Sequence, residues 1–205
     1  MPGSRKLPSI LPCDFYDRDP ALVARELLGK LLVRQTSMEL CGGPIVETEA
    51  YLAQDDSSCH SSRGRTRKNA TMFGRPGLLY VYPIHARHCL NAVTEGEGVA
   101  SAVLIRAIEP TIGLEGMMAR RKVSKAEHVA RGPARLCEAL DVDRRLDGWD
   151  LTLGEEIWIA EDAPAASPLR IGVSPRIGVT SAHDLELRFY ILENRFVSGP
   201  RRRAW

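Results

Sequence analysis

Several short strand-like segments follow one another through connections too short to hold a helix, and this feature limits the possible folds most strongly. Parallel strands need a crossover of about a dozen residues or more, whereas antiparallel strands can be joined by a tight turn. The sequence Glu95-Gly96-Glu97-Gly98 between two apolar runs is typical of such a turn. The strand candidates are residues 30–34, 44–52, 78–83, 88–93, 101–108, 151–159 and 185–192. We therefore expect an α+β fold with a mainly antiparallel sheet and helices packed around it.

Helix signals are fewer and lie between these strands. Asp19 and Pro20 have the residue types of an N-cap and a first helical position. A second helix is expected over residues 132–140, where a Gly-Pro pair marks its start, and a further helical region is expected within residues 111–130. Residues 162–175 are rich in Ala, Pro and Ser and predict a surface loop.

Length and composition indicate a globular protein with one domain. The chain has 205 residues, 44% of them hydrophobic and 26% charged, and it contains no convincing repeat. We expect a single domain over residues 1–205, with flexible tails at 1–14 and 199–205. The N-terminus lacks the apolar core of a signal peptide, and no apolar run is long enough to span a membrane. We therefore expect a soluble, cytoplasmic protein that does not act at a membrane.

Several cofactor classes are disfavoured by the motifs. The five cysteines are an odd number without a C-x-x-C pair, which argues against a disulfide framework or a zinc ribbon. No P-loop and no G-x-G-x-x-G follows a predicted strand, so a nucleotide cofactor is not expected. His85, His88 and a nearby cysteine leave a metal site as an alternative. Residues three apart on a strand point to opposite faces, however, so we expect no metal and no other cofactor.

Positive charge is concentrated in one part of a nearly neutral chain. Lys and Arg number 28 and Asp and Glu number 26, yet residues 57–94 contain no acidic residue at all. The cations of this stretch are Arg63, Arg65, Arg67, Lys68, Arg75 and Arg87. Such a patch is typical of a protein that binds a polyanion. A solvated surface loop is the alternative.

Two strands carry candidate catalytic residues. Side chains alternate between the two faces of a strand, so Glu47, Glu49 and Tyr51 share one face of the predicted strand 44–52. This face could form the wall of an active site, or it could be a polar surface in contact with water. Arg106 lies within the apolar run 101–108, where a buried guanidinium needs a carboxylate partner. Glu47 or Glu49 could supply it, unless Arg106 points outward from a sheet edge.

The strand at 78–83 places Tyr80 and Tyr82 on one face. Aromatic faces beside a basic segment are the groups on which nucleic-acid bases stack. Paired strand tyrosines are also common in ordinary cores, so both interpretations stay open here.

These segments together resemble the alkyladenine (3-methyladenine) DNA glycosylase family, which are monofunctional base-excision repair enzymes. The matching stretches are IVETEAYL (45–52), MFGRPGLLYVY (72–82), CLN (89–91), VLIRAIEP (103–110) and GPARLCEAL (132–140). The resemblance runs from about residue 21 to residue 192. It implies one domain around a curved antiparallel sheet, from which a β-hairpin inserts into DNA, and we expect a monomer.

The resemblance also implies roles for individual residues. Glu49 matches the general base that deprotonates the attacking water, and Arg106 matches the arginine that helps to hold this water. An adjacent arginine is expected to keep Glu49 ionised by lowering its pKa. Tyr51, His60 and Tyr82 match the walls of the pocket for the flipped base. Asn91 matches an asparagine that clashes with the amino group of guanine.

The sequence departs from the family at the tip of the hairpin. Family members usually read Tyr-Val-Tyr-x-x-Tyr-Gly, and their last tyrosine fills the gap that the flipped nucleotide leaves. This chain has His85 in place of that tyrosine. An imidazole stacks less area than a phenol, so we expect weaker stabilisation of the flipped state. Contacts with the DNA backbone are expected from Arg63, Arg65, Arg67 and Lys68.

The function implied by the resemblance is a DNA-repair hydrolase. It would flip alkylated adenine or guanine, hypoxanthine or ethenoadenine out of double-stranded DNA and hydrolyse the N-glycosidic bond, leaving an abasic site without lyase activity. In a bacterium it would associate with the nucleoid. A binding module for damaged nucleic acid without catalysis, and a metal-assisted hydrolase using His85 and His88, are the alternatives.

Overall fold

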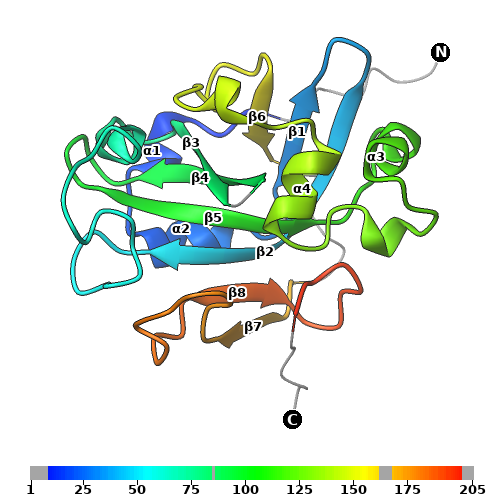
Figure 1. Cartoon of the computed structure of the whole chain (residues 1–205). Coiled ribbons are helices and arrows are strands. Elements are labelled where there is room, and N and C mark those ends of the chain that lie inside the picture. The colour runs from blue at the N-terminus through cyan, green and yellow to red at the C-terminus, as the bar shows by residue number, and fades with distance from the viewer. Residues whose placement is uncertain (1–8, 85, 162–167, 200–205) are drawn as a thin grey trace.

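The computed structural model describes residues 9–84, 86–161 and 168–199, and an antiparallel sheet forms its centre (Figure 1). The strands are β1 (Leu31–Gln35), β2 (Leu40–Tyr51), β3 (Leu79–Ile84), β4 (Arg87–Thr94), β5 (Ser101–Ile108), β6 (Ile157–Ala160), β7 (Ile171–Ser174) and β8 (Arg188–Ile191). The α-helices are α1 (Cys13–Tyr16), α2 (Pro20–Glu26), α3 (Leu114–Arg121) and α4 (Pro133–Ala139). Short 3-10 turns lie at Ala70–Phe73, Ala126–His128 and Arg144–Leu146. The expected α+β class with a curved, mainly antiparallel sheet is confirmed.

Strand β2 organises the sheet because its neighbours change along its length. The strand order is β3-β4-β5-β2-β1-β6, and β8 pairs with both β2 and β7. β2 is 12 residues long. β1 pairs with residues 40–44, β5 with residues 45–51 and β8 with residues 47–49. Residues 47–49 therefore have a strand on each side and lie in the interior of the sheet.

The same part of β2 is irregular. Its register with β5 shifts between Ile45 and Glu47 and again between Glu47 and Thr48. A bulge bends a strand and redirects its side chains, and bulges are frequent beside active sites. The hydroxyl of Thr48 donates a hydrogen bond to the carbonyl of Ala24 in α2, at 2.8 Å. The bulge thus determines which side chains of β2 contact α2 and which contact other parts of the protein.

Helix α2 begins where the sequence predicts it. The carboxylate of Asp19 accepts hydrogen bonds from the backbone N–H groups of Ala21 and Leu22, at 2.9 and 3.0 Å. α2 packs against β2 and β5, and α4 packs against β4 and β5. Val23 of α2 and Leu136 of α4 are completely buried in the main apolar core. Within the described residues, no helix combines the length and the apolarity that a membrane span requires.

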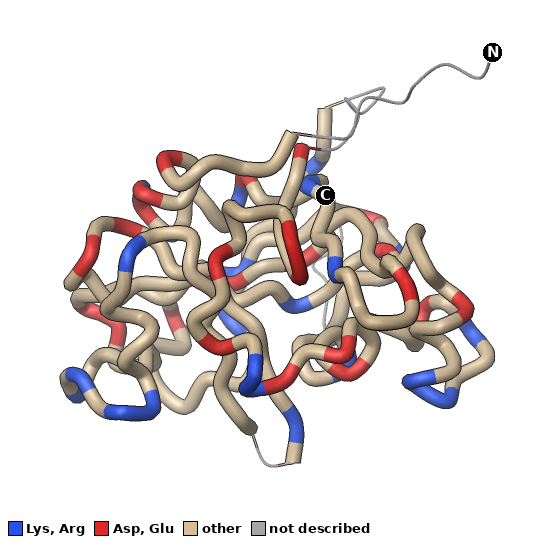
Figure 2. The backbone as a smooth tube through the Cα atoms, turned by 90° about the horizontal axis from the view of Figure 1, so that it is seen from above, with Lys and Arg blue, Asp and Glu red and all other residues tan. Residues whose placement is uncertain are grey.

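Strands β3 and β4 form the expected hairpin, which projects at the lower edge of Figure 2. β3 lies at the sheet edge, where unpaired backbone groups would be exposed. The carboxylate of Asp147 accepts a hydrogen bond from Val81 N–H, and Arg144 donates one to the Val81 carbonyl, each at 2.9 Å. These contacts fix the base of the hairpin. His85, expected at its tip, lies outside the described residues.

The expected N-terminal tail is too long. Ile10 forms a β-bridge with Ala160, and the N–H of the buried Leu11 donates a hydrogen bond to the Ile159 carbonyl at 2.9 Å. The fold therefore includes the chain from about residue 10 onward. The remaining tail segments, 1–8 and 200–205, lie outside the described residues.

Two predicted segments near the C-terminus are also wrong in part. Of the predicted strand 151–159, only residues 157–159 are extended, as part of β6, because Asp150 accepts a hydrogen bond from Thr152 N–H and Gly154 has a φ of +71°. Residues 171–174 lie in the segment expected to be a loop, but they form β7 and pair with β8. This strand depends on its partner, since its own sequence is too short to give a strand signal.

Candidate active site

Glu47 and Glu49 of β2 meet Arg106 of β5 in the interior of the sheet. Arg106 Nε lies 3.0 Å from Glu47 Oε1, and Arg106 Nη1 lies 3.1 Å from Glu49 Oε2. Both glutamate side chains are fully buried, and that of Arg106 is 6% exposed. The expected pairing of Arg106 with a carboxylate is confirmed. The alternatives, a polar strand face in water and an outward-pointing arginine, are wrong.

The two carboxylates have different partners. Glu47 also accepts hydrogen bonds from Arg188 Nε and from Ser198 N–H, each at 2.7 Å. Its oxygens are therefore occupied by donors that belong to the scaffold. Glu49 instead accepts hydrogen bonds from the backbone N–H of Ile177 at 2.7 Å and from the hydroxyl of Tyr51 at 3.0 Å. Glu49 is thus the glutamate that contacts one of the predicted pocket aromatics.

Burial raises the pKa of Glu49 above that of an ordinary glutamate. The charge of Arg106 and the hydrogen bonds from Ile177 and Tyr51 lower it and offset only part of the shift. The expectation that the arginine gives Glu49 a lowered pKa is therefore wrong in its net direction, because desolvation outweighs the nearby charge. A carboxylate with a raised pKa is also a stronger base, which suits proton abstraction from water near neutral pH.

The predicted pocket aromatics gather in one cluster. The rings of Tyr80 and Tyr82 stack with centroids 5.6 Å apart, and His60 meets Tyr82 edge-on at 4.4 Å. His60 Nδ1 lies 3.0 Å from the hydroxyl of Tyr80. Tyr51 and Tyr82 pack against the same buried cluster. Burial lowers the pKa of His60, which favours its neutral form.

Asn91 lies close to this cluster on β4. Its side chain is buried, and Nδ2 donates a hydrogen bond to the Tyr80 carbonyl at 3.0 Å. Asn91 pairs with Leu104 of β5, and Leu104 pairs with Glu49 of β2. One strand therefore separates Asn91 from Glu49. The structure brings the predicted residues into one region of the sheet, while their individual roles stay predictions.

The predicted DNA-contacting residues lie on an exposed loop. Arg63, Arg65, Arg67 and Lys68 are all exposed, and the loop projects at the left of the molecule (cyan in Figure 1). Asn69, which the sequence analysis missed, is buried and holds this loop. Its Nδ2 donates to the carbonyls of His60 and Gly64 at 2.8 and 3.0 Å, and its Oδ1 accepts from Thr66 N–H at 2.6 Å. The basic loop and the candidate pocket residue His60 are thus linked by one side chain.

A second missed feature is a buried ion pair between Asp56 and Arg176, next to Tyr51. The two residues are 120 positions apart in the chain. No local pattern in the sequence could have joined them. The one hint is the position of Arg176 in the sequence. It directly precedes Ile177, whose N–H binds Glu49.

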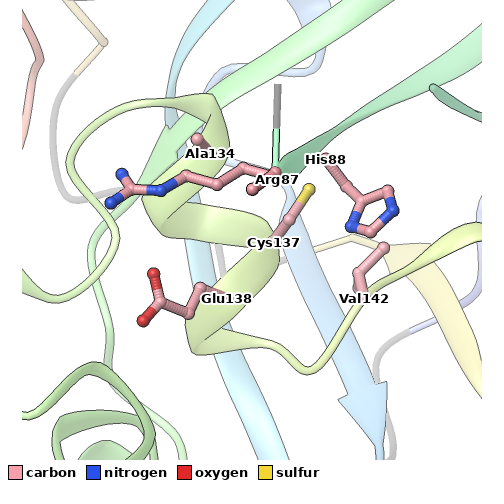
Figure 3. Close-up of a pocket in the computed structure, with 7 residues that line it drawn as sticks. Arg87, His88, Ala134, Cys137, Glu138 and Val142 are labelled. Atoms are coloured by element: carbon pink, nitrogen blue, oxygen red, sulfur yellow. The ribbon is translucent and has the colours of Figure 1, made fainter. Parts of the chain in front are cut away.

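Of the residues in the metal alternative, His85 lies outside the described residues, and the described His88 and Cys89 do not converge. His88 and Cys89 are neighbours on β4, so their side chains point to opposite faces. His88 lines a cavity of about 330 Å³ together with Arg87 and residues of α4 (Figure 3). This cavity shares no residue with the Glu49 cluster. Within the part of the chain that the structure describes, no group of three or more His, Cys, Asp or Glu could hold a metal ion.

Comparisons with known proteins point to one family. Residues 14–195 match the family model described as Methylpurine-DNA glycosylase. A relative from Rhodopirellula baltica is 46% identical over 194 residues, which is 92% of this chain and 83% of the relative. Relatives from Koribacter versatilis and Methanocella arvoryzae are 44% and 47% identical and cover 93% and 87% of this chain, or 94% and 89% of their own lengths. All three carry the name "Putative 3-methyladenine DNA glycosylase".

Proposed function

The chain belongs to the methylpurine-DNA glycosylase family, and on this premise we propose that it releases damaged purines from double-stranded DNA by hydrolysis. The substrates are alkylated purines and deaminated or etheno-modified adenine, and the product is an abasic site. The proposal is supported by the buried Glu49–Arg106 pair beside a cluster of aromatic rings.

Glu49 acts as the general base in this reaction. Cleavage of a purine N-glycosidic bond passes through an oxocarbenium-like sugar and needs an activated water on the side opposite the leaving base. Glu49 takes a proton from that water, and its charge also stabilises the developing cation. Its raised pKa makes it a better proton acceptor than an exposed glutamate.

Arg106 and Ile177 position the carboxylate rather than react. Arg106 is held by Glu47 through its Nε, which leaves Nη1 to contact Glu49. Ile177 N–H holds the other oxygen of Glu49 at 2.7 Å. A carboxylate fixed at both oxygens keeps the orientation that proton abstraction requires.

Recognition of the base depends on the aromatic cluster. The target base has to rotate out of the duplex, at a cost of a few kcal/mol that is smallest for damaged or mispaired bases. Tyr51 and Tyr82 stack on the rotated base, His60 completes the wall, and Asn91 disfavours guanine. For a cationic alkylated purine, a good cation–π contact with the ring of Tyr82 adds about 0.5–2 kcal/mol.

Contacts with the DNA backbone come from the basic loop. The exposed side chains of Arg63, Arg65, Arg67 and Lys68 neutralise phosphates and give an affinity that depends on salt but not on sequence. The β3–β4 hairpin enters the duplex, with His85 in the gap that the rotated nucleotide leaves. The protein acts as a monomer.

A lyase step is not part of the proposal, because such a step needs an amine nucleophile. The described lysines are Lys30, Lys68, Lys122 and Lys125. Lys30 pairs with Glu161 and the others are exposed, so none of the described lysines contacts Glu49.

Base release from lesion-containing duplexes tests the proposal. We expect the purified protein to liberate hypoxanthine, ethenoadenine or 3-methyladenine from an oligonucleotide duplex and to leave a site that alkali cleaves. Strands that stay intact without alkali would agree with the absence of a lyase step. Tight binding of all lesion duplexes without release of any base would instead favour the non-catalytic binding module.

A further inference from the structure

The Asp56–Arg176 pair is a completely buried ion pair close to the candidate site. Arg176 Nη1 and Nη2 lie 2.6 and 2.7 Å from the two oxygens of Asp56, and neither side chain is exposed to solvent. Arg176 Nη1 also donates to the carbonyl of Ala50 at 3.0 Å. Asp56 accepts further hydrogen bonds from the N–H groups of Leu52 and Ser58, each at 3.1 Å. Such a bidentate pair holds both partners in a fixed geometry.

The guanidinium of Arg176 covers one face of the Tyr51 ring. Its Cζ atom lies 4.6 Å from the ring centroid. Its Nε is buried and has no hydrogen-bond partner among the described residues. The negative π face of Tyr51 therefore provides the electrostatic contact on this side of the cation. A base that stacks on Tyr51 has to use the other face of the ring.

The pair also ties two segments of the site together. Ile177, which follows Arg176, donates its N–H to Glu49. Asp56 lies between Tyr51 and His60 in the loop that joins them. A second link between the same segments runs from the hydroxyl of Ser58 to Ser181, where the two Oγ atoms are 3.1 Å apart. The positive charge of Arg176 is therefore fixed against one face of the Tyr51 ring.

A fixed cation behind an aromatic ring changes what the open face of that ring attracts. The ring quadrupole is already engaged by Arg176, and a second cation on the opposite face would also feel like-charge repulsion through a medium of low dielectric. A neutral purine meets neither penalty, and its electron-rich ring stacks well on an electron-depleted partner. Asp56 moderates the field of Arg176 because its opposite charge lies next to it.

We propose that Arg176, held by Asp56, is a specificity-determining residue that shifts lesion choice toward neutral purines such as hypoxanthine and away from cationic alkylated purines. The inference rests on the proposed function. It assigns Arg176 a role in base selection that acts through Tyr51, so Arg176 is a positioning residue and takes no part in the chemical step.

The test compares kcat/KM for duplexes that contain hypoxanthine with kcat/KM for duplexes that contain cationic 7-methylguanine. In the double variant Arg176→Gln/Asp56→Asn the cation is gone, while both positions keep amide groups of similar shape. We expect the neutral-to-cationic ratio of kcat/KM to fall by about three- to tenfold, in line with cation–π energies at partly desolvated sites. In Asp56→Asn alone the cation loses its counter-charge, and the ratio should rise. Any bias from Asn91 cancels, because the ratio is compared between variants.

The control is Lys30→Gln, which removes a cation from the Lys30–Glu161 salt bridge and should leave the ratio unchanged. Circular dichroism and thermal unfolding would verify that each variant is folded at the assay temperature. An equal loss on both substrates, with an unchanged ratio, would show a purely structural role and overturn the inference. A change of the kcat/KM ratio in the same direction in both Arg176→Gln/Asp56→Asn and Asp56→Asn would also overturn the inference. Failure of the wild-type protein to release either base would instead refute the proposed function.

Discussion

Two identical side chains two positions apart on β2 differ only in their surroundings. The oxygens of Glu47 are occupied by Arg106, Arg188 and the backbone of Ser198. Glu49 contacts the Tyr51 hydroxyl and has a raised pKa. At the scale of single residues, therefore, the hydrogen-bond partners and not the residue type separate a structural carboxylate from a candidate base.

The raised pKa of Glu49 predicts a pH dependence. The reaction needs the ionised carboxylate, so the rate of base release should fall as the pH drops through a value above the usual range of a glutamate. Arg106 lowers the pKa of Glu49, and Arg106→Gln should therefore move this inflection to higher pH. Single-turnover rates from about pH 4 to 8 would measure both inflections. An inflection that stays in place or moves to lower pH in the variant would contradict this account.

A contact of Arg106 with Glu47 or Glu49 could be predicted from the sequence, because an arginine in an apolar strand needs a buried partner, and the structure shows that it contacts both. Whether the pKa of Glu49 is raised or lowered could not be predicted from the sequence. It depends on how completely the bulged strand is covered, and this becomes known only from the packed structure. The role of Asn69 was missed for a related reason, since its partners include the backbone carbonyl of His60.

At the scale of elements, the basic loop and the β3–β4 hairpin are each fixed by hydrogen bonds that a few side chains make. Asn69 holds the loop, and Asp147 with Arg144 covers the edge of β3. Both elements can therefore present exposed groups to DNA while their bases stay fixed. Figure 2 shows how the cations are distributed along the backbone around them.

The basic loop should determine the salt dependence of DNA binding. Replacing Arg65 and Arg67 by Ala should reduce the slope of log K against log salt by about two units, or about one for each lost phosphate contact, with little change in lesion preference. The control is Lys125→Ala, an exposed cation beside the Ala126–His128 turn. Fluorescence anisotropy at several salt concentrations would measure the slopes. Equal slopes for wild type and the double variant would place the phosphate contacts elsewhere.

Elements with strong local signals were predicted well from the sequence, and elements that depend on distant partners were not. Asp19-Pro20 correctly marks the start of α2, and the turn around Gly96 correctly joins β4 and β5. β7 has no such signal and exists because β8 pairs with it. The strand expected from residue 151 starts only at Ile157, since the Asp150 turn interrupts it.

At the scale of the whole molecule, Asp56 and Arg176 join parts of the chain 120 residues apart. Burial raises the pKa of Asp56, but hydrogen bonds from Arg176 and from backbone N–H groups lower it more, so the net shift is downward. A carboxyl group with a lowered pKa in the folded state stabilises the fold above its unfolded pKa, and this contribution is lost as the pH falls through the folded value.

This linkage predicts a pH-dependent difference in stability. Asp56→Asn should lower the free energy of unfolding at pH 7 by about 3–5 kcal/mol, because it leaves Arg176 buried without its partner charge. The difference from wild type should begin to shrink below about pH 4, where aspartate in the unfolded chain takes up a proton, and should shrink further as the pH falls through the lower pKa of folded Asp56. Urea unfolding of both proteins at a series of pH values would measure it. A difference that is independent of pH would argue against an ionised Asp56 in the fold.

The central claim is that an ionised Glu49 activates the water that separates the purine from its sugar. Single-turnover release of hypoxanthine, measured beside DNA affinity for wild type and Glu49→Gln, tests this claim most directly. We predict that the variant loses at least about 10²-fold in release rate, the scale of general-base catalysis, while it still binds the lesion duplex. A variant that binds equally well and releases the base at the wild-type rate would contradict the claim.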